Sequence, residues 1–232
     1  MMQIPKAVLF DLDETLSDRS AAIADYVGRL TERFGAQFTC REPEFVHRAF
    51  QAADGNGYRD KAEAFELFVR AVGWRNPPSA DEYLSIWKST IPECTRPMKR
   101  LLDMLGYFRQ AGVPLGLITN GSSAVQNGKI ERLGIRPYFR AILISGEVGI
   151  KKPDERIFQM ALEALGAEPQ EAWFIGDHPL NDVCGAKACG LQAVWLKGEH
   201  IWDGALPYSP DYTVSGLHEL VDLHRMLEKR IG

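Results

Sequence analysis

The chain has 232 residues, of which 45% are hydrophobic and 25% are charged. This composition is close to the average for globular proteins and excludes a largely disordered, collagen-like or low-complexity chain. The 27 Lys and Arg residues against 31 Asp and Glu residues give a formal net charge of −4. This charge disfavours a nucleic acid polymer as partner, because no overall positive field attracts a polyphosphate backbone. A small anionic ligand held by local positive groups is compatible with it.

Targeting and redox features of the sequence indicate a cytoplasmic protein with no membrane partner. The N-terminal segment lacks the regions of a signal peptide, and no stretch approaches the roughly 18 apolar residues that span a bilayer. The cysteines are too few for a disulfide scaffold in a chain of this length, and their spacing is not that of a zinc site. They are Cys40, Cys94, Cys184 and Cys189. The sequence leaves the oligomeric state open.

Short apolar runs recur along the chain and are typical of strands that are buried on both faces of a sheet. They cover residues 6–10, 114–118, 141–144, 172–175 and 193–196. Helical patterns cover residues 98–110, 125–133, 155–165 and 182–189, and an edge strand at 212–214 precedes a closing helix at 216–229. The alternation of strand and helix predicts an α/β fold with a doubly wound parallel sheet.

A long interval between the first and second apolar runs contains no comparable strand. Helical periodicity instead covers residues 19–34, 44–53, 61–72 and 81–88, and the prolines at positions 77, 78, 92 and 97 indicate turns. We therefore predict two domains. Residues 1–16 and 95–232 form the α/β core, and residues 17–94 form an inserted small helical cap.

Polar residues gather where the predicted strands end. Because ligands of an open parallel sheet bind at the carboxyl ends of its strands, near the switch in strand order, we expect these residues to form one site. They are Asp11, Asp13 and Thr15 after the first strand, Thr119, Asn120 and Gly121 after the second, Lys151, Lys152 and Pro153 after the third, and Gly176, Asp177 and Asp182 at and after the fourth.

Four of these residues are carboxylates, namely Asp11, Asp13, Asp177 and Asp182. Held close together, they would repel one another and raise their own pKa values unless a cation joined them. Ligands that are all oxygen atoms favour a hard divalent ion, so we expect Mg²⁺ before Zn²⁺. Lysine and threonine beside such an ion suit an anion with tetrahedral oxygens, and phosphate is the natural candidate.

In this order the residues resemble the four motifs of the haloacid dehalogenase superfamily of phosphatases. The resemblance covers nearly the whole chain, and the inserted helices resemble the C1-type cap of that superfamily. The segments at 118–121, 146–149 and 195–196 resemble the branch that holds pyrimidine 5′-nucleotidases and N-acylneuraminate-9-phosphatases.

The resemblance implies an enzyme that hydrolyses a small phosphate monoester, of the nucleoside monophosphate or sugar phosphate class, through an aspartyl-phosphate. It makes Asp11 the nucleophile, and Asp13 the group that protonates the leaving oxygen and then activates water. Thr119 would donate a hydrogen bond to a phosphoryl oxygen, and Lys152 would neutralise charge on the phosphate and the nucleophile.

The resemblance also implies the groups that hold the ligands. Mg²⁺ would be bound by Asp11, the backbone carbonyl of Asp13 and Asp177, with Asp182 in or just behind the ligand shell. Asn120 and Gly121 would line the phosphate site together with Lys152.

Two alternatives to a phosphatase stay open. One is a phosphomutase of the same superfamily, which keeps the acid at the position of Asp13. A dehalogenase needs no acid at this position and is therefore disfavoured. A phospho-accepting signalling or binding module gathers similar residues without turnover, but such modules are about half as long and carry no inserted cap. The sequence names no substrate and assigns no role to His178.

Overall fold

The computed structural model describes residues 2–230, which divide into two compact units. Of the described residues, one unit comprises 2–18 and 96–230, and the other comprises Arg19–Thr95. The boundaries predicted from the sequence, after residues 16 and 94, lie two residues and one residue earlier.

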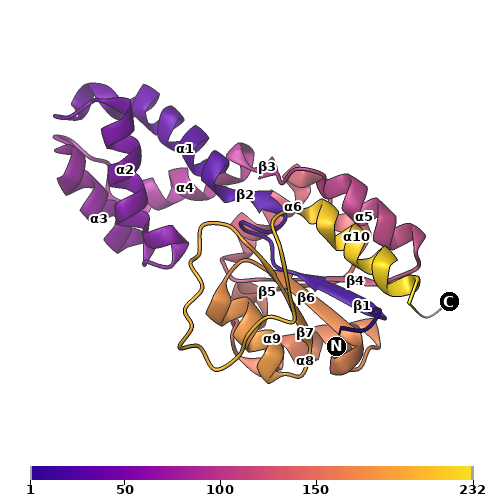
Figure 1. The fold of residues 1–232 in the computed structure, drawn as a ribbon. Helices are drawn as coiled ribbons and strands as arrows, with labels where there is room; N and C mark the ends of the chain where they lie inside the picture. The colour runs from indigo at the N-terminus through magenta and orange to yellow at the C-terminus, as the bar shows by residue number, and fades with distance from the viewer. Residues whose placement is uncertain (1, 231–232) are drawn as a thin grey trace. The chain divides into compact units, whose positions relative to one another are not determined.

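A parallel sheet forms the centre of the first unit (Figure 1). It has six strands, in the order β5-β4-β1-β6-β7-β8. The predicted fold class is therefore confirmed. On β1, Phe10 pairs with Leu117 of β4 and with Ile175 of β6, so that the chain order switches beside β1. The strands are β1 (Ala7–Phe10), β4 (Leu115–Thr119), β5 (Phe139–Ile144), β6 (Ala172–Gly176), β7 (Gln192–Leu196) and β8 (Tyr212–Val214).

Helices cover both faces of this sheet. Val8 and Phe10 of β1 lie in a hydrophobic cluster with side chains of α5, α6 and α10, whereas Ala7 and Leu9 lie in a cluster with α8 and α9. Burial on both faces explains why β1 is an uninterrupted apolar run, because successive side chains of a strand point to opposite faces. The helices are α5 (Leu101–Gln110), α6 (Ser123–Leu133), α7 (Ser145–Val148), α8 (Glu155–Leu165), α9 (Gly185–Ala188) and α10 (Leu217–Glu228).

The second unit consists of four helices around an aromatic core. Tyr26 packs edge-on against Trp87, with ring centroids 4.8 Å apart, and Phe65 stacks on Tyr83 at 4.1 Å. The carboxylate of Asp54 is buried beside this core and binds both Arg19 and Lys61. The helices are α1 (Arg19–Phe34), α2 (Pro43–Asp54), α3 (Lys61–Val72) and α4 (Ala80–Cys94). Single turns of 3₁₀ helix span Gly35–Gln37 and Gly55–Gly57 in this unit, and Arg136–Tyr138 and Pro169–Glu171 in the first unit.

Several local predictions were wrong. The structure shows that α4 continues through Pro92 to Cys94, where the sequence predicted a turn. Pro92 lacks the N–H that would donate within the helix, and only two residues of α4 follow it. The helix predicted over 182–189 begins earlier, as the π-helix Pro179–Cys184 (η5), and continues into α9. An antiparallel ribbon of β2 (Ser17–Asp18) and β3 (Arg96–Pro97) was not predicted. No helix within residues 2–230 is both long and apolar enough to cross a membrane.

Candidate active site

Asp11 lies at the carboxyl end of the central strand β1. The pairing of β1 with β6 continues one residue further, because the Asp11 N–H donates to the Ile175 carbonyl at 2.9 Å. The Asp11 side chain is buried, and the Lys152 ammonium donates to its Oδ1 at 2.6 Å. Within residues 2–230, no hydrogen bond is made to the second carboxylate oxygen, Oδ2. The strand therefore presents one carboxylate oxygen of Asp11 to Lys152 and leaves the other without such a contact.

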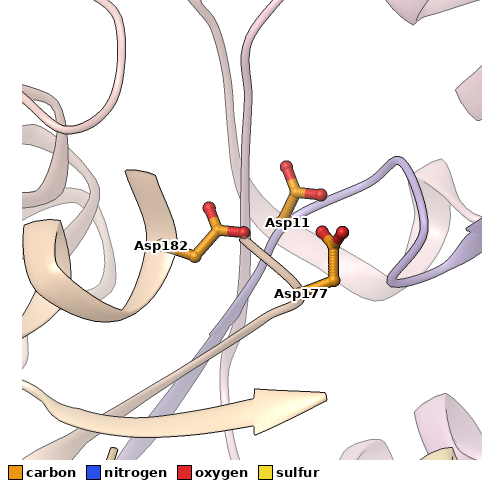
Figure 2. Close-up of side chains that lie close together, drawn as sticks. All are labelled: Asp11, Asp177 and Asp182. Carbon is orange, nitrogen blue, oxygen red and sulfur yellow. The ribbon is translucent and has the colours of Figure 1, made fainter. Parts of the chain in front are cut away.

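Two further carboxylates lie beside Asp11. Asp177 directly follows β6, and Asp182 belongs to η5, the π-helix that begins two residues later. The side chains of the three acids lie close together (Figure 2). One carboxylate oxygen from each lies within 4.8 Å of the others, and all three residues are buried. Lys152 also donates to Asp182 Oδ1 at 2.6 Å. Four of the residues predicted from the sequence therefore meet in one buried cluster.

Gly176 permits this close approach. A Cβ atom at position 176 would lie 2.5 Å from both the Cβ and the Cγ of Asp182, a separation that no side chain tolerates. Asp182 is fixed further by the His178 N–H, which donates to its Oδ2 at 3.0 Å. The Trp195 indole N–H donates to the backbone carbonyl of Asp177 at 2.7 Å. The absence of a side chain at Gly176 thus allows the Asp182 side chain of η5 to lie directly against the end of β6.

Burial and mutual repulsion shift the titration of the acids. Burial, together with the charges of Asp182 and Asp11, raises the pKa of Asp177 to about 9. Burial also raises the pKa of Asp11 to about 7, although the nearby Lys152 opposes this rise. For Lys152, burial alone would lower the pKa, but the charges of Asp11 and Asp182 outweigh burial and raise it. Asp177 and Asp11 therefore bind a proton more tightly than an isolated aspartate does.

A divalent cation fits this cluster. Its three acids offer oxygen atoms only, they are buried, and they are close enough together to share one ion. Hard cations such as Mg²⁺ and Ca²⁺ prefer ligands of this kind, and a bound cation would relieve the repulsion that raises the two pKa values. Asp13, the fourth predicted ligand, is not part of the side-chain cluster. Its predicted contribution is a backbone carbonyl.

The residues predicted to bind phosphate make contacts within the protein. The Asn120 side chain accepts from the Lys152 N–H at 2.9 Å and donates to the Lys152 carbonyl at 3.0 Å, so it fixes the backbone that carries the lysine. The Gly121 N–H donates to Ser145 Oγ at 2.9 Å. The Thr119 hydroxyl is buried and accepts from the Gln126 amide at 2.5 Å. A direct role of Asn120 and Gly121 on phosphate stays a prediction.

The Asp13 carboxylate binds residues that the sequence analysis missed. Lys129 donates to both of its oxygens, at 2.8 and 2.7 Å, and Gln126 donates to Oδ2 at 3.1 Å. Ser17 donates to Oδ1 at 3.0 Å. Gln126 and Lys129 share one face of α6, and both are buried although they are polar. The only indication in the sequence is that these two polar residues, three positions apart, lie beside the apolar positions of the helix that face the core.

His178 has a structural role at the start of η5. Its Nδ1 accepts from the N–H groups of Leu180 and Asn181, both at 3.1 Å, and so caps this helix. The His200 imidazole lies nearby, with its Nε2 3.5 Å from Asp177 Oδ2. Burial and the neighbouring His200 lower the pKa of His178.

Comparison with known proteins identifies the family. The family model described as haloacid dehalogenase-like hydrolase matches residues 8–196, which contain all the strand-end residues described above. The chain belongs to this family. It is a hydrolase of the family, and the resemblance inferred from its motifs is confirmed.

Curated relatives of this family member are named as phosphatases. Glyceraldehyde 3-phosphate phosphatase of Methanopyrus kandleri is 30% identical over 97% of this chain and 99% of its own length. Phosphoserine phosphatase of Thermus thermophilus is 45% identical, but the match spans 50% of this chain and only 46% of that relative. Both proteins of the predicted branch are also relatives. Pyrimidine 5′-nucleotidase of Escherichia coli is 36% identical over 58% of this chain and 60% of its own length, and N-acylneuraminate-9-phosphatase of Rattus norvegicus is 28% identical over 98% and 96%.

A solved structure shares the same fold. The HAD-type hydrolase YfnB of Bacillus subtilis, solved with bound magnesium, superposes with a TM-score of 0.76. It is 22% identical, and the match covers 96% of this chain and 99% of that one.

Proposed function

We propose that this hydrolase is a Mg²⁺-dependent phosphatase that cleaves a small phosphate monoester through an aspartyl-phosphate on Asp11. One observation carries the proposal: a buried aspartate at the end of the central strand contacts a buried lysine and lies beside two further buried carboxylates. This combination supports the proposal, because it would bring a nucleophile, a positive group for an incoming anion and a set of cation ligands together. Asp11, Asp177 and Asp182 would hold the cation, together with the Asp13 carbonyl.

The first half of the proposed reaction transfers the phosphoryl group to the protein. A carboxylate oxygen of Asp11 attacks phosphorus, and the bond between phosphorus and the ester oxygen breaks. Asp13 gives its proton to the departing oxygen, so that an alcohol leaves. Lys152 and the Thr119 hydroxyl stabilise the charge that builds on the phosphoryl oxygens, and a Mg²⁺ ion held by the three acids would supply further positive charge.

The second half returns the enzyme to its starting state. Asp13, now a carboxylate, takes a proton from water, and the water oxygen attacks phosphorus. The bond between phosphorus and Asp11 breaks and inorganic phosphate leaves. Asp13 thereby regains the proton that it gave away in the first half.

The inserted unit, residues 17–94 in the sequence analysis, is proposed to act as a cap that selects the substrate. Its Tyr58 side chain is 55% exposed although it is large and partly apolar. Replacement of Tyr58 by alanine should change the ranking of natural phosphate esters more than it changes activity on p-nitrophenyl phosphate. Equal losses on both kinds of ester would contradict a selective role.

A panel of phosphate esters tests the proposed function. It should contain nucleoside monophosphates, sugar phosphates, glyceraldehyde 3-phosphate, phosphoserine and p-nitrophenyl phosphate, each assayed for phosphate release with Mg²⁺ and with EDTA. We expect many turnovers per enzyme on at least one member and none in EDTA.

Other results would identify the alternatives. Isomerisation of a sugar phosphate without release of phosphate would indicate a phosphomutase. Uptake of one phosphoryl group per protein without further turnover would indicate a phospho-accepting module.

A further inference from the structure

We propose that Lys129 and Gln126 of α6 are positioning residues that hold the Asp13 carboxylate in place for proton transfer. The inference rests on the proposed function, because Asp13 gives and takes a proton only in that reaction. It adds two residues that no strand-end motif contains, and both come from a helix on one face of the sheet.

Three side chains converge on one carboxylate. Lys129 reaches both oxygens of Asp13, while Ser17 donates to Oδ1 and Gln126 donates to Oδ2. An aspartate side chain has few rotatable bonds, so donors on both of its oxygens leave it little freedom to turn. The Asp13 carboxylate is therefore fixed by α6 and by the ribbon strand β2 rather than by its own loop alone.

Gln126 connects Asp13 to the phosphate-binding group. The same amide nitrogen that donates to Asp13 also donates to the Thr119 hydroxyl, at 2.5 Å. A fixed distance between the proton carrier and the phosphoryl-binding hydroxyl is what a proton transfer to the ester oxygen needs. Both contacts would be lost together if Gln126 moved.

Stability alone gives little reason for a lysine at position 129. Its side chain is only 8% exposed, and removing an ammonium from water is costly. A buried ion pair adds little net stability compared with apolar side chains of similar size. Lys129 donates to both Asp13 oxygens, so its positive charge serves to hold this carboxylate.

The test replaces Lys129 by methionine, which keeps the length of the side chain and removes its charge. Arg132→Met, on an exposed position of the same helix, is the matched control. Each protein is assayed with Mg²⁺ on an alkyl phosphate that the wild type hydrolyses and on p-nitrophenyl phosphate. The p-nitrophenolate group leaves without a proton, so only the second half of the reaction needs Asp13 for this substrate.

We expect Lys129→Met to lower kcat on the alkyl ester by about 10- to 100-fold, with KM within about twofold of wild type. On p-nitrophenyl phosphate it should release a rapid burst of one p-nitrophenolate per active site, followed by slow turnover. Lys129→Arg should restore most of the activity, and Arg132→Met should behave like the wild type.

A variant that loses activity equally on both esters without a burst, or loses none, would overturn the inference. If Lys129→Met does not fold, as judged by circular dichroism, Lys129→Gln serves in its place with the same expectations. A wild type that turns over no ester would instead remove the proposed function, so the two failures are distinguishable.

Discussion

At the scale of single residues, the candidate site consists of three buried acids and one buried lysine. Lys152 contacts Asp11 and Asp182, while Asp177 completes a set of carboxylates within 4.8 Å of one another. The sequence was sufficient to name these residues, because each follows directly on, or lies close behind, a recognisable apolar strand.

The partners of Asp13 could not be named in the same way. Lys129 is 116 residues from Asp13 along the chain, and only its place among the apolar positions of α6 distinguishes it from a lysine exposed to solvent. Its contact with Asp13 arises only when α6 packs against the sheet. Asn120 is similar, since its bonds to the Lys152 backbone depend on two loops that meet in the fold.

Asp11→Asn is predicted to abolish turnover without unfolding the protein. The amide is close in size to the carboxylate but is a poor nucleophile, so kcat should fall by at least about 10³-fold on every ester. Phosphate release and circular dichroism, measured on the same preparation, check this outcome. A folded variant with unchanged activity would remove Asp11 from the mechanism.

Asp177 is predicted to make the metal-free protein less stable as pH rises. Its pKa is about 9 in the folded protein and near 4 in an unfolded chain, so the folded state binds the proton more tightly. This contribution to stability is fully present below about pH 4 and is lost as pH rises through the folded value.

The comparison that isolates this effect is between wild type and Asp177→Asn in EDTA. Between pH 5 and pH 9 the wild type should lose free energy of unfolding relative to the variant, on the order of 5 kcal/mol. Urea unfolding at several pH values measures it. A difference between the two proteins that stays constant across this range would show that Asp177 is ionised throughout.

At the scale of elements, the strands were easier to predict than the helices. A strand buried on both faces, such as β1, is a continuous apolar run, and its ends are marked by polar residues. The end of α4 and the start of η5 were misplaced because local signals compete there with packing. Pro92 indicated that α4 ends before it, but the helix continues for two more residues. At Pro179 the chain enters a π-helix, and this helix carries Asp182 into the site.

Gly176→Ala is predicted to disturb the junction between β6 and η5. The added Cβ would displace Asp182, so we expect a loss of about 1–3 kcal/mol in the free energy of unfolding and weaker Mg²⁺ binding. Gly106→Ala in α5 is the control, because no atom lies within 4 Å of its Cβ position and alanine favours a helix. Thermal unfolding of both variants checks the prediction, which fails if Gly176→Ala is as stable as wild type.

At the scale of the whole molecule, one chain combines an α/β unit, which holds every residue of the candidate site, with an inserted unit of four helices. The interruption in the apolar runs was enough to predict the insert. Substrate preference could not be predicted, because the side chains of a helical insert follow no recognisable code for a ligand.

Mg²⁺ is predicted to stabilise the α/β unit. An ion that binds only the folded state at 100 times its Kd adds about 2.7 kcal/mol, which corresponds to roughly 5–10 °C in Tm for a chain of this size. Asp182→Asn should lose most of the shift, whereas Asp222→Asn, on an exposed position of α10, should keep it. An equal shift in both variants would place the ion elsewhere.

A phosphoryl group is predicted to pass through Asp11 during each turnover, and the most direct measurement locates that group. Asp13→Asn enzyme is mixed with p-nitrophenyl phosphate and Mg²⁺, quenched and reduced with borohydride, and its peptides are sequenced by mass spectrometry. Because p-nitrophenolate leaves without a proton and the variant lacks the base for hydrolysis, Asp11 should be phosphorylated and reduced to homoserine. A phosphoryl group on another residue, or release of p-nitrophenolate with Asp11 unmodified, would contradict the account.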